Sequence, residues 1–251
     1  MKNKYHNEFT IFKYLVSTDR YKAIFGITLI FALYGSVALG VPTDDFCSSV
    51  LVPFQFYIFN IFLFVLFFLN QLNVCSTFQK EFSSYIIRLK TKREYIKTLL
   101  RLSVLAHLYQ ILILFLLMMV IFWLTTFHQL SIEPYMNYSI SNIVYVIFYM
   151  VRYTIFSLMI ILISTLGFVW LKDKILIVLQ AGFLALLFIG SYSDATIHEH
   201  ISLSIWNYFQ GISYSSFSLE VTSSIAMLLV LEIILLVFYS FCIKSKRVVI
   251  A

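Results

Sequence analysis

Charged residues are scarce in this chain of 251 residues, where they make up 12% of the sequence against 61% hydrophobic residues. The mean hydropathy of +0.91 lies far above that of water-soluble domains. A soluble core of this size could not bury so many apolar groups, and 26 Phe with 17 Tyr would leave an adhesive surface in water. The scarcity of charge therefore excludes a soluble globule and predicts an all-α integral membrane protein.

Patterns typical of enzymes are missing as well. The complete Gly-x-x-x-x-Gly-Lys-Ser/Thr motif that cradles a nucleotide phosphate does not occur in the sequence. An intramembrane protease would need a Glu-Glu pair and histidines on successive spans, but no Glu-Glu occurs and only His107 is expected within a span. His198 and His200 supply just two metal ligands, and on a helix their rings diverge by about 200°. We predict no catalytic residue and no metal site.

Six apolar runs have the length of about 20 residues that crosses a hydrocarbon core of ~30 Å. Their bounds are 23–40, 52–74, 102–127, 143–171, 175–191 and 224–243. The fourth and fifth runs are separated by a short charged turn, which indicates a tight helical hairpin. With no internal repeat and no soluble domain, the whole chain, 1–251, is predicted to be one transmembrane domain.

The basic residues are distributed very unevenly between the loops. All but one of the 18 Lys and Arg fall before the first span, between the second and third, between the fourth and fifth, or after the sixth, whereas the opposite loops hold acidic residues alone. The positive-inside rule then places both termini in the cytoplasm of a multi-pass protein of the cell membrane, and we expect a bacterial one. The net charge of +6 thus reflects the orientation of the chain in the membrane, and we expect no nucleic-acid partner.

The segment ahead of the first span is amphipathic. Phe9, Phe12, Leu15 and Val16 recur at helical spacing, while Lys13 falls elsewhere on the helical wheel. Such a helix can lie along the inner leaflet before the chain enters the membrane. The alternative is a frayed tail.

A second amphipathic pattern lies between the second and third spans. Phe82, Tyr85, Ile86 and Leu89 fall at i, i+3, i+4 and i+7, so that one face of a short helix is apolar. This pattern predicts a separate helix over 82–89 that lies across the cytoplasmic mouth of the bundle. The alternative is a basic loop that satisfies topology and holds anionic lipid.

A helix start follows this short helix directly. Thr91 and Glu94 match the Ser/Thr-x-x-Glu capping box, in which the hydroxyl caps the amide at Glu94 and the carboxylate returns to the amide of Thr91. We therefore expect a new helix that begins at Lys92 and continues into the third span.

Topology and this loop together resemble the type-2 permease subunits of ABC transporters, which have six spans and cytoplasmic termini. In that family a Glu soon after the second span is followed by a short helix, a Leu, a Ser/Thr with a basic pair, and an aromatic residue that leads into the third span. The matching residues here are Glu81, Leu89, Thr91, Lys92, Arg93 and Tyr95. Two Ser replace a Gly that often follows the Glu, and the usual Pro near the break is absent.

The resemblance implies that 82–89 is the coupling helix that docks in a cytoplasmic ABC ATPase, and that 9–16 is the interfacial elbow helix. It assigns to the ATPase interface Glu81, Phe82, Tyr85, Ile86, Arg88, Leu89, Lys92 and Arg93. ATP and Mg would be bound by that ATPase and no cofactor by the chain itself. The other expected partners are a second permease copy or a related permease, and membrane lipid. The implied function is export of a hydrophobic peptide, antibiotic or lipid-like cargo.

Two charges fall inside predicted spans, where each is costly unless paired or hydrated. Arg152 and Glu232 lie nine and eight residues from the outer ends of the fourth and sixth spans, or about 14 and 12 Å deep. A pair between them would remove most of the cost and hold an outer gate. Alternatively, Arg152 extends to the headgroups and Glu232 pairs elsewhere.

The outer segment 194–223 is rich in aromatic residues, and we expect it to form re-entrant or interfacial helices before the last span. Two other classes of function stay open. One is a six-span peptide-immunity or receptor protein that acts without an ATPase, and the other is an intramembrane enzyme.

Overall fold

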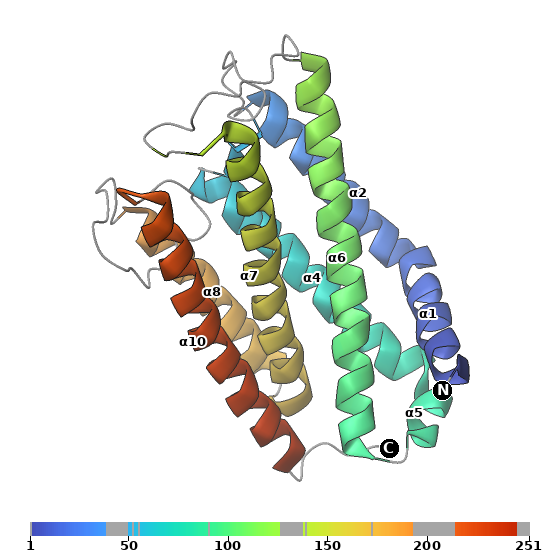
Figure 1. Ribbon diagram of the computed structural model, residues 1–251. Helices are drawn as coiled ribbons and strands as arrows, with labels where there is room; N and C mark the ends of the chain where they lie inside the picture. The colour runs from blue at the N-terminus through green and yellow to red at the C-terminus, as the bar shows by residue number, and fades with distance from the viewer. Residues whose placement is uncertain are drawn as a thin grey trace.

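The described part of the protein is a bundle of α-helices without a strand (Figure 1). The computed structural model describes residues 2–38, 50–51, 53–54, 56–89, 91–125, 138, 140–171, 173–192 and 214–244. In chain order the helices are α1 (Lys2–Ser17), α2 (Asp19–Ala38), α4 (Tyr57–Glu81), α5 (Ser83–Arg88), α6 (Lys92–Thr125), α7 (Asn142–Trp170), α8 (Asp173–Tyr192) and α10 (Phe217–Lys244).

Four of these helices are long and apolar enough to cross a membrane. The qualifying segments are Ile58–Glu81, Lys92–Leu124, Asn142–Trp170 and Phe217–Lys244. The prediction of an all-helical chain with several membrane-crossing helices is confirmed in this form. α2 and α8 are helical where the first and fifth spans are predicted, but α8 has only a shorter apolar segment, Ile175–Ile189. The count of six spans stays a prediction.

α4 is the central helix of the bundle. It packs against α2, α6, α7 and α8, whereas α10 packs against α7 at one side of the molecule (Figure 1). α1 lies against α6, α2 and α4 near the end of the bundle that also carries α5. We call this end the inner end, because α1, α5 and the start of α6 bring basic residues there, and the opposite end the outer end.

The break between α5 and α6 forms as the capping pattern predicts. The backbone N–H of Glu94 donates to Thr91 Oγ1 at 3.2 Å, and α6 begins at Lys92. This bond satisfies one of the amides that a helix start leaves without an intrahelical acceptor. α5 ends at Arg88, and the backbone of Leu89 after it is extended (φ −75°, ψ 104°), so the chain leaves the helix before the new one starts.

Buried apolar side chains form two separate cores. The outer core contains large aromatic residues such as Phe54, Phe64 and Tyr153, and the inner core contains residues such as Leu15, Phe78 and Leu99. Between the two cores lies a layer of buried polar side chains, which we call the polar belt. Its members are Thr28, Asn70, Gln71, Ser103, His107, Gln110, Ser157, Ser164, Thr165 and Gln180.

Asn70 on α4 connects the belt to α6 and α2. Its Nδ2 donates to Gln110 Oε1 at 2.7 Å, and Gln110 Nε2 donates in turn to Thr28 Oγ1 at 3.1 Å. One chain of hydrogen bonds therefore joins three helices. Such hydrogen bonds matter in a bilayer, because contact between two apolar helix faces is little more favourable than contact of each face with lipid.

Gln71, the next residue of α4, connects the belt to α7 and α8. Gln71 Oε1 accepts from Ser164 Oγ at 2.9 Å and from Gln180 Nε2 at 3.3 Å. Gln180 Nε2 also lies 2.8 Å from Ser164 Oγ, which closes a three-helix cluster. A single amide oxygen thus fixes the position of two neighbouring helices relative to α4.

His107 lies inside the bundle and has a structural role. Its Nε2 lies 2.8 Å from Ser157 Oγ, and its ring packs edge-on against Phe67 with centroids 4.8 Å apart. A second bond between the same two helices joins Thr165 Oγ1 to Ser103 Oγ at 3.1 Å. The buried histidine is accounted for by helix packing.

Replacing Gln71 by Leu is expected to lower the free energy of unfolding by about 1–2 kcal/mol, because the Ser164 hydroxyl and the Gln180 amide lose their shared acceptor. The matched control is Gln79→Leu on the same helix. Gln79 is exposed and donates to Tyr95 Oη at 3.0 Å, so its loss should cost less than about 0.5 kcal/mol. Unfolding in mixed micelles measures both, and equal losses would contradict the role of the belt.

Candidate functional site

The outer end contains a fully buried ion pair between α7 and α10. Arg152 Nη1 contacts Glu220 Oε1, and the two side chains are 2% and 0% exposed. Arg152 lies ten residues into α7, about 15 Å from its start, whereas Glu220 lies in the first turn of α10. The two residues meet because α10 starts lower along the bundle than α7 does (Figure 1).

Glu220 is held by two further donors. Tyr138 Oη donates to Glu220 Oε2 at 2.5 Å, and Tyr145 Oη donates to Glu220 Oε1 at 3.0 Å. These two hydroxyls and Arg152 give the buried carboxylate three hydrogen-bond donors, which offset the cost of its burial. The site is therefore an electrostatic cluster that ties the chain before α7, α7 itself and α10 together.

Arg152 is less completely satisfied than its partner. Its guanidinium lies over the rings of Phe148 and Tyr149, with 5.5 and 5.2 Å to the two centroids. These contacts contribute cation–π attraction in an apolar environment. Its Nε and Nη2 are buried and have no hydrogen-bond partner among the described residues. The cation is thus anchored at one nitrogen and by aromatic faces.

The pairing of Arg152 with Glu232 that the sequence suggests is wrong. Glu232 is exposed on α10, and Arg152 has Glu220 as its partner. The error comes from the start of the last helix, which the apolar run places at residue 224 and the structure at Phe217. Ser216 marks this earlier start, because its Oγ accepts from the N–H of Leu219 at 3.4 Å.

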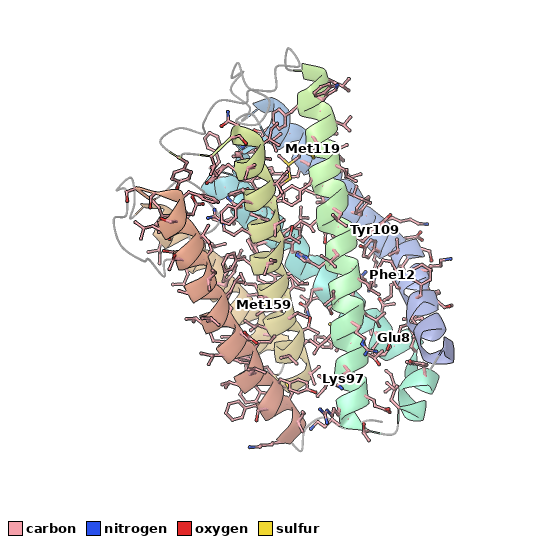
Figure 2. All side chains as sticks on the ribbon, viewed as in Figure 1. Glu8, Phe12, Lys97, Tyr109, Met119 and Met159 are labelled. Atoms are coloured by element: carbon pink, nitrogen blue, oxygen red, sulfur yellow. The ribbon has the colours of Figure 1, made fainter. Side chains whose placement is uncertain are left out.

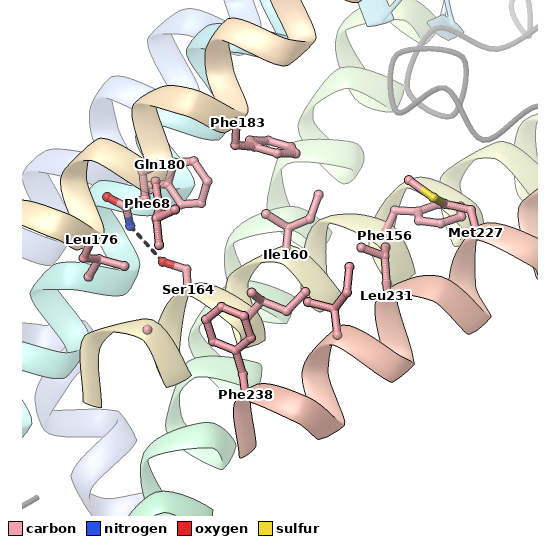
Figure 3. Close-up of a pocket in the computed structure, with 14 residues that line it drawn as sticks. Phe68, Phe156, Ile160, Ser164, Leu176, Gln180, Phe183, Met227, Leu231 and Phe238 are labelled. Carbon is pink, nitrogen blue, oxygen red and sulfur yellow. Dashed lines mark hydrogen bonds between the residues drawn. The ribbon is translucent and has the colours of Figure 1, made fainter. Parts of the chain in front are cut away.

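An apolar pocket of about 260 Å³ lies between α4, α7, α8 and α10 (Figure 3). Its lining includes Phe68, Phe156, Phe183 and Phe238 from these four helices. Exposed apolar residues, Leu179 on α8 and Ile234 on α10, form part of the rim. We call it the lateral pocket, since its rim faces outward from the bundle.

One wall of the lateral pocket is polar. Ser164 and Gln180, which belong to the polar belt, line it beside Gly167. A Cβ at Gly167 would lie 3.0 Å from Leu176 Cδ1, so glycine there permits the close approach of α7 and α8. The pocket can hold a hydrophobic chain and offer a few hydrogen-bonding groups at one side.

The predicted ATPase-interface residues fall into a buried group and an exposed group around α5. Ile86 and Leu89 are buried in the inner core, and Phe82 and Tyr85 are half-buried against it. Glu81 and Arg93 are exposed and Lys92 is half-buried, while the side chain of Arg88 lies outside the described atoms. The apolar stripe therefore packs on the chain's own helices, and Ser83 at the start of α5 is exposed.

Aromatic contacts fix α5 in this position. The ring of Phe82 packs edge-on against Tyr14 of α1 at 5.3 Å, and the ring of Tyr85 packs against Phe78 of α4 at 6.3 Å. Phe78 also stacks on Tyr95 at the start of α6, with centroids 6.0 Å apart. A displacement of α5 would thus change packing contacts with α1 and α4 and, through Phe78, with α6.

α1 is joined to α6 by an ion pair that the sequence pattern does not reveal. Arg101 Nη1 lies 2.9 Å from Glu8 Oε1, and the Glu8 side chain is 6% exposed. Figure 2 shows Glu8 and Phe12 between the two helices, where Phe12 packs edge-on against Tyr109 at 6.0 Å. Of the predicted apolar stripe, Leu15 is buried and Phe9 is 52% exposed. Helix formation over 9–16 is confirmed, and its interfacial position stays a prediction.

Several predictions lie outside the described residues. These concern the metal-like pair His198 and His200 and residues 194–213 of the outer segment 194–223. Among the described residues, no group of three or more His, Cys, Asp or Glu is placed to hold a metal ion. Comparison of the chain with protein-family models, with curated proteins and with solved structures finds no match.

Sequence reasoning missed Glu220 and the glutamines of the polar belt. Glu220 looks like one more acidic residue of an outer loop, and only the Ser ahead of Phe217 indicates that a helix has already begun. Gln180 stands alone in an apolar run, and Gln71 lies between Asn70 and Asn73 near the end of another. Their position in predicted spans was the available signal, because polar side chains inside membranes usually have a partner there.

Glu220→Leu is expected to lower the free energy of unfolding by about 3–5 kcal/mol, since it leaves Arg152 buried without its counter-charge. The same substitution at Glu232 on the same helix should cost nothing, because it removes a carboxylate from an exposed apolar face. Replacing both Arg152 by Met and Glu220 by Leu should cost less than Glu220→Leu alone. Equal losses for Glu220→Leu and Glu232→Leu in mixed micelles would contradict this assignment.

Proposed function

We propose that this chain is the permease subunit of an ABC transporter, with six spans and both termini in the cytoplasm of a bacterial cell membrane. A separate ATPase that binds ATP and Mg drives it, and the cargo is a hydrophobic peptide, antibiotic or lipid-like molecule. Four helices that can cross a membrane, with α2 and α8 as the shorter first and fifth spans, support the membrane part of this proposal.

The observation that carries the proposal is the position of α5. This helix of six residues stands between two long helices at the inner end, and its apolar side is anchored in the inner core. A loop that merely joined two spans would not need a buried anchor and a capped break. Exposed residues beside this anchor include Ser83 of α5, Glu81 at the end of α4 and Arg93 in the first turn of α6, and the last two offer charged groups to a partner.

The contacts of α5 suggest how ATPase closure would reach the membrane part. A push on α5 acts on Phe78 of α4 through Tyr85, and α4 carries Gln71 about two turns further along. Gln71 binds Ser164 and Gln180, which line the lateral pocket. Motion at the inner end can therefore change the shape of that pocket, which we assign to the cargo.

The buried pair of Arg152 and Glu220 acts in this scheme as the outer lock. It joins α7 and α10, two of the four helices around the lateral pocket, in the outer half of α7 and at the outer end of α10. Closed, the pair prevents these two helices from separating outward. Because the lateral pocket is small, we expect a second copy or a related permease to complete the pathway.

Two substitutions at exposed positions at the α4–α5 junction, Glu81→Arg and Ser83→Trp, are expected to reduce co-purification of the ATPase roughly tenfold, since charge reversal and steric clash at an interface cost at least ~1.4 kcal/mol. The control is Lys22→Glu, an exposed charge at the same end but away from α5. All three variants should keep the wild-type unfolding free energy. A stable wild-type chain that brings no ATPase out of the membrane would favour the ATPase-free immunity or receptor function.

Ile234→Trp should weaken binding of a dansyl-labelled acyl probe to the purified chain roughly tenfold. The indole would fill part of the lateral pocket, so that about two methylene groups of the probe would no longer be buried there. Ile234 lines the lateral pocket, whereas its neighbour Ile233 is 61% exposed and does not. Ile233→Trp is therefore the matched control and should bind the probe as the wild type does. Equal binding by both variants would exclude the lateral pocket as the cargo site.

A further inference from the structure

Two adjoining cavities of about 530 Å³ each lie between α2 and α4 at the inner end, and Glu81 is the one residue of their lining that the proposed ATPase contact also uses. They share Arg20, Asn73 and Ser76, so together they form one continuous groove, which we call the α2–α4 groove. The remaining residues of the first cavity are Tyr14, Thr18, Asp19, Thr77, Lys80 and Glu81, and those of the second are Ala23, Ile24, Leu72, Phe168 and Ile177.

The groove changes from polar to apolar in the same direction along both helices. On α2 the lining passes from Arg20 to Ile24 within about one turn, and on α4 it passes from Lys80 to Leu72 within about two turns. The polar part lies toward the inner end and the apolar part toward the middle of the bundle. A molecule that fits this order has a polar head and a hydrophobic tail.

Asn73 supplies a hydrogen-bond donor at the junction of the two cavities. The residue is 8% exposed, and its Oδ1 accepts from Thr77 Oγ1 at 3.5 Å. Its Nδ2 is buried and has no hydrogen-bond partner among the described residues. A buried donor without an acceptor costs about 1–3 kcal/mol, which a ligand oxygen in the groove would recover.

The charges at the mouth of the groove favour an anion. Arg20 and Lys80 are exposed, and neither forms an ion pair within the described part of the chain. The lining also contains two acidic residues. Asp19 forms an ion pair with Lys22 at 3.8 Å, so Glu81 is the acidic residue left to balance the charges of Arg20 and Lys80. Basic grooves between membrane helices at the inner leaflet suit anionic phospholipid headgroups.

We propose that the α2–α4 groove binds one anionic phospholipid. Arg20 and Lys80 hold its phosphate, the Asn73 amide donates to a phosphate or ester oxygen, and an acyl chain lies along Ile24, Leu72 and Phe168. The lipid joins α2 to α4 in a place where the two helices leave space between them. Tyr14, which lines the same groove, packs on Phe82 directly before α5, so a bound lipid also stabilises the position of α5.

The test measures lipid retained by the purified full chain. The chain is exchanged into mild detergent with phosphatidylglycerol or phosphatidylcholine, and native mass spectrometry counts the bound lipid. We expect one retained phosphatidylglycerol, bound about fivefold more weakly by Arg20→Gln and by Lys80→Gln, the factor for one basic residue near a phosphate. Asn73→Leu should weaken retention as well. Arg93→Gln, an exposed cation at the same end outside the groove, should retain lipid as the wild type does.

Three outcomes overturn the proposal. They are equal retention by Arg20→Gln, Lys80→Gln and Arg93→Gln; equal retention of phosphatidylcholine and phosphatidylglycerol; and binding of soluble glycerol phosphate as tight as binding of the lipid. The last outcome would mean that the apolar half of the groove is not used. Arg20 and Lys80 are exposed, so their substitution leaves the bundle folded, and the assay needs no ATPase. Its result is therefore independent of the proposed transport function.

Discussion

Two neighbouring amides on α4, Asn70 and Gln71, hold the helices together half-way along the bundle. Asn70 reaches α6 and, through Gln110, α2, while Gln71 binds α7 and α8. In lipid, close packing and hydrogen bonds decide which helices meet, because the apolar faces are equally well solvated by acyl chains. Once these bonds set the order of helices around α4, the outer and inner cores can each pack in one way.

The two ends of the bundle differ in chemistry, and α4 connects them. At the outer end, Asn60 of α4 accepts from Tyr153 Oη at 3.1 Å close to the cluster around Arg152. At the inner end, Phe78 of α4 carries the aromatic contacts that hold α5. A helix bound at both ends and in the middle can carry a displacement along its axis. This arrangement suits a membrane subunit that is driven from one side and opens on the other.

Local patterns in the sequence predicted the helices well and their contacts poorly. Apolar runs located α7 within one residue at each end, and Thr91 with Glu94 located the start of α6, since both signals lie within a few neighbouring residues. The partner of Arg152 depends on the position of α10 relative to α7 along the bundle axis, and no local sequence pattern encodes that position. Periodicity likewise showed that Ile86 and Leu89 share a face of α5, but not that the face covers the chain's own core.

The central claim is that the end carrying α5 lies in the cytoplasm and the end carrying Glu220 lies outside. Single cysteines at Ser83 and at Ser218, both exposed positions, test it most directly once Cys47, Cys75 and Cys242 are replaced. A membrane-impermeant maleimide added to intact cells should label Ser218→Cys at once and Ser83→Cys only after the membrane is opened. Labelling of Ser83→Cys in intact cells would place α5 outside, where no ATPase can reach it, and would contradict the account.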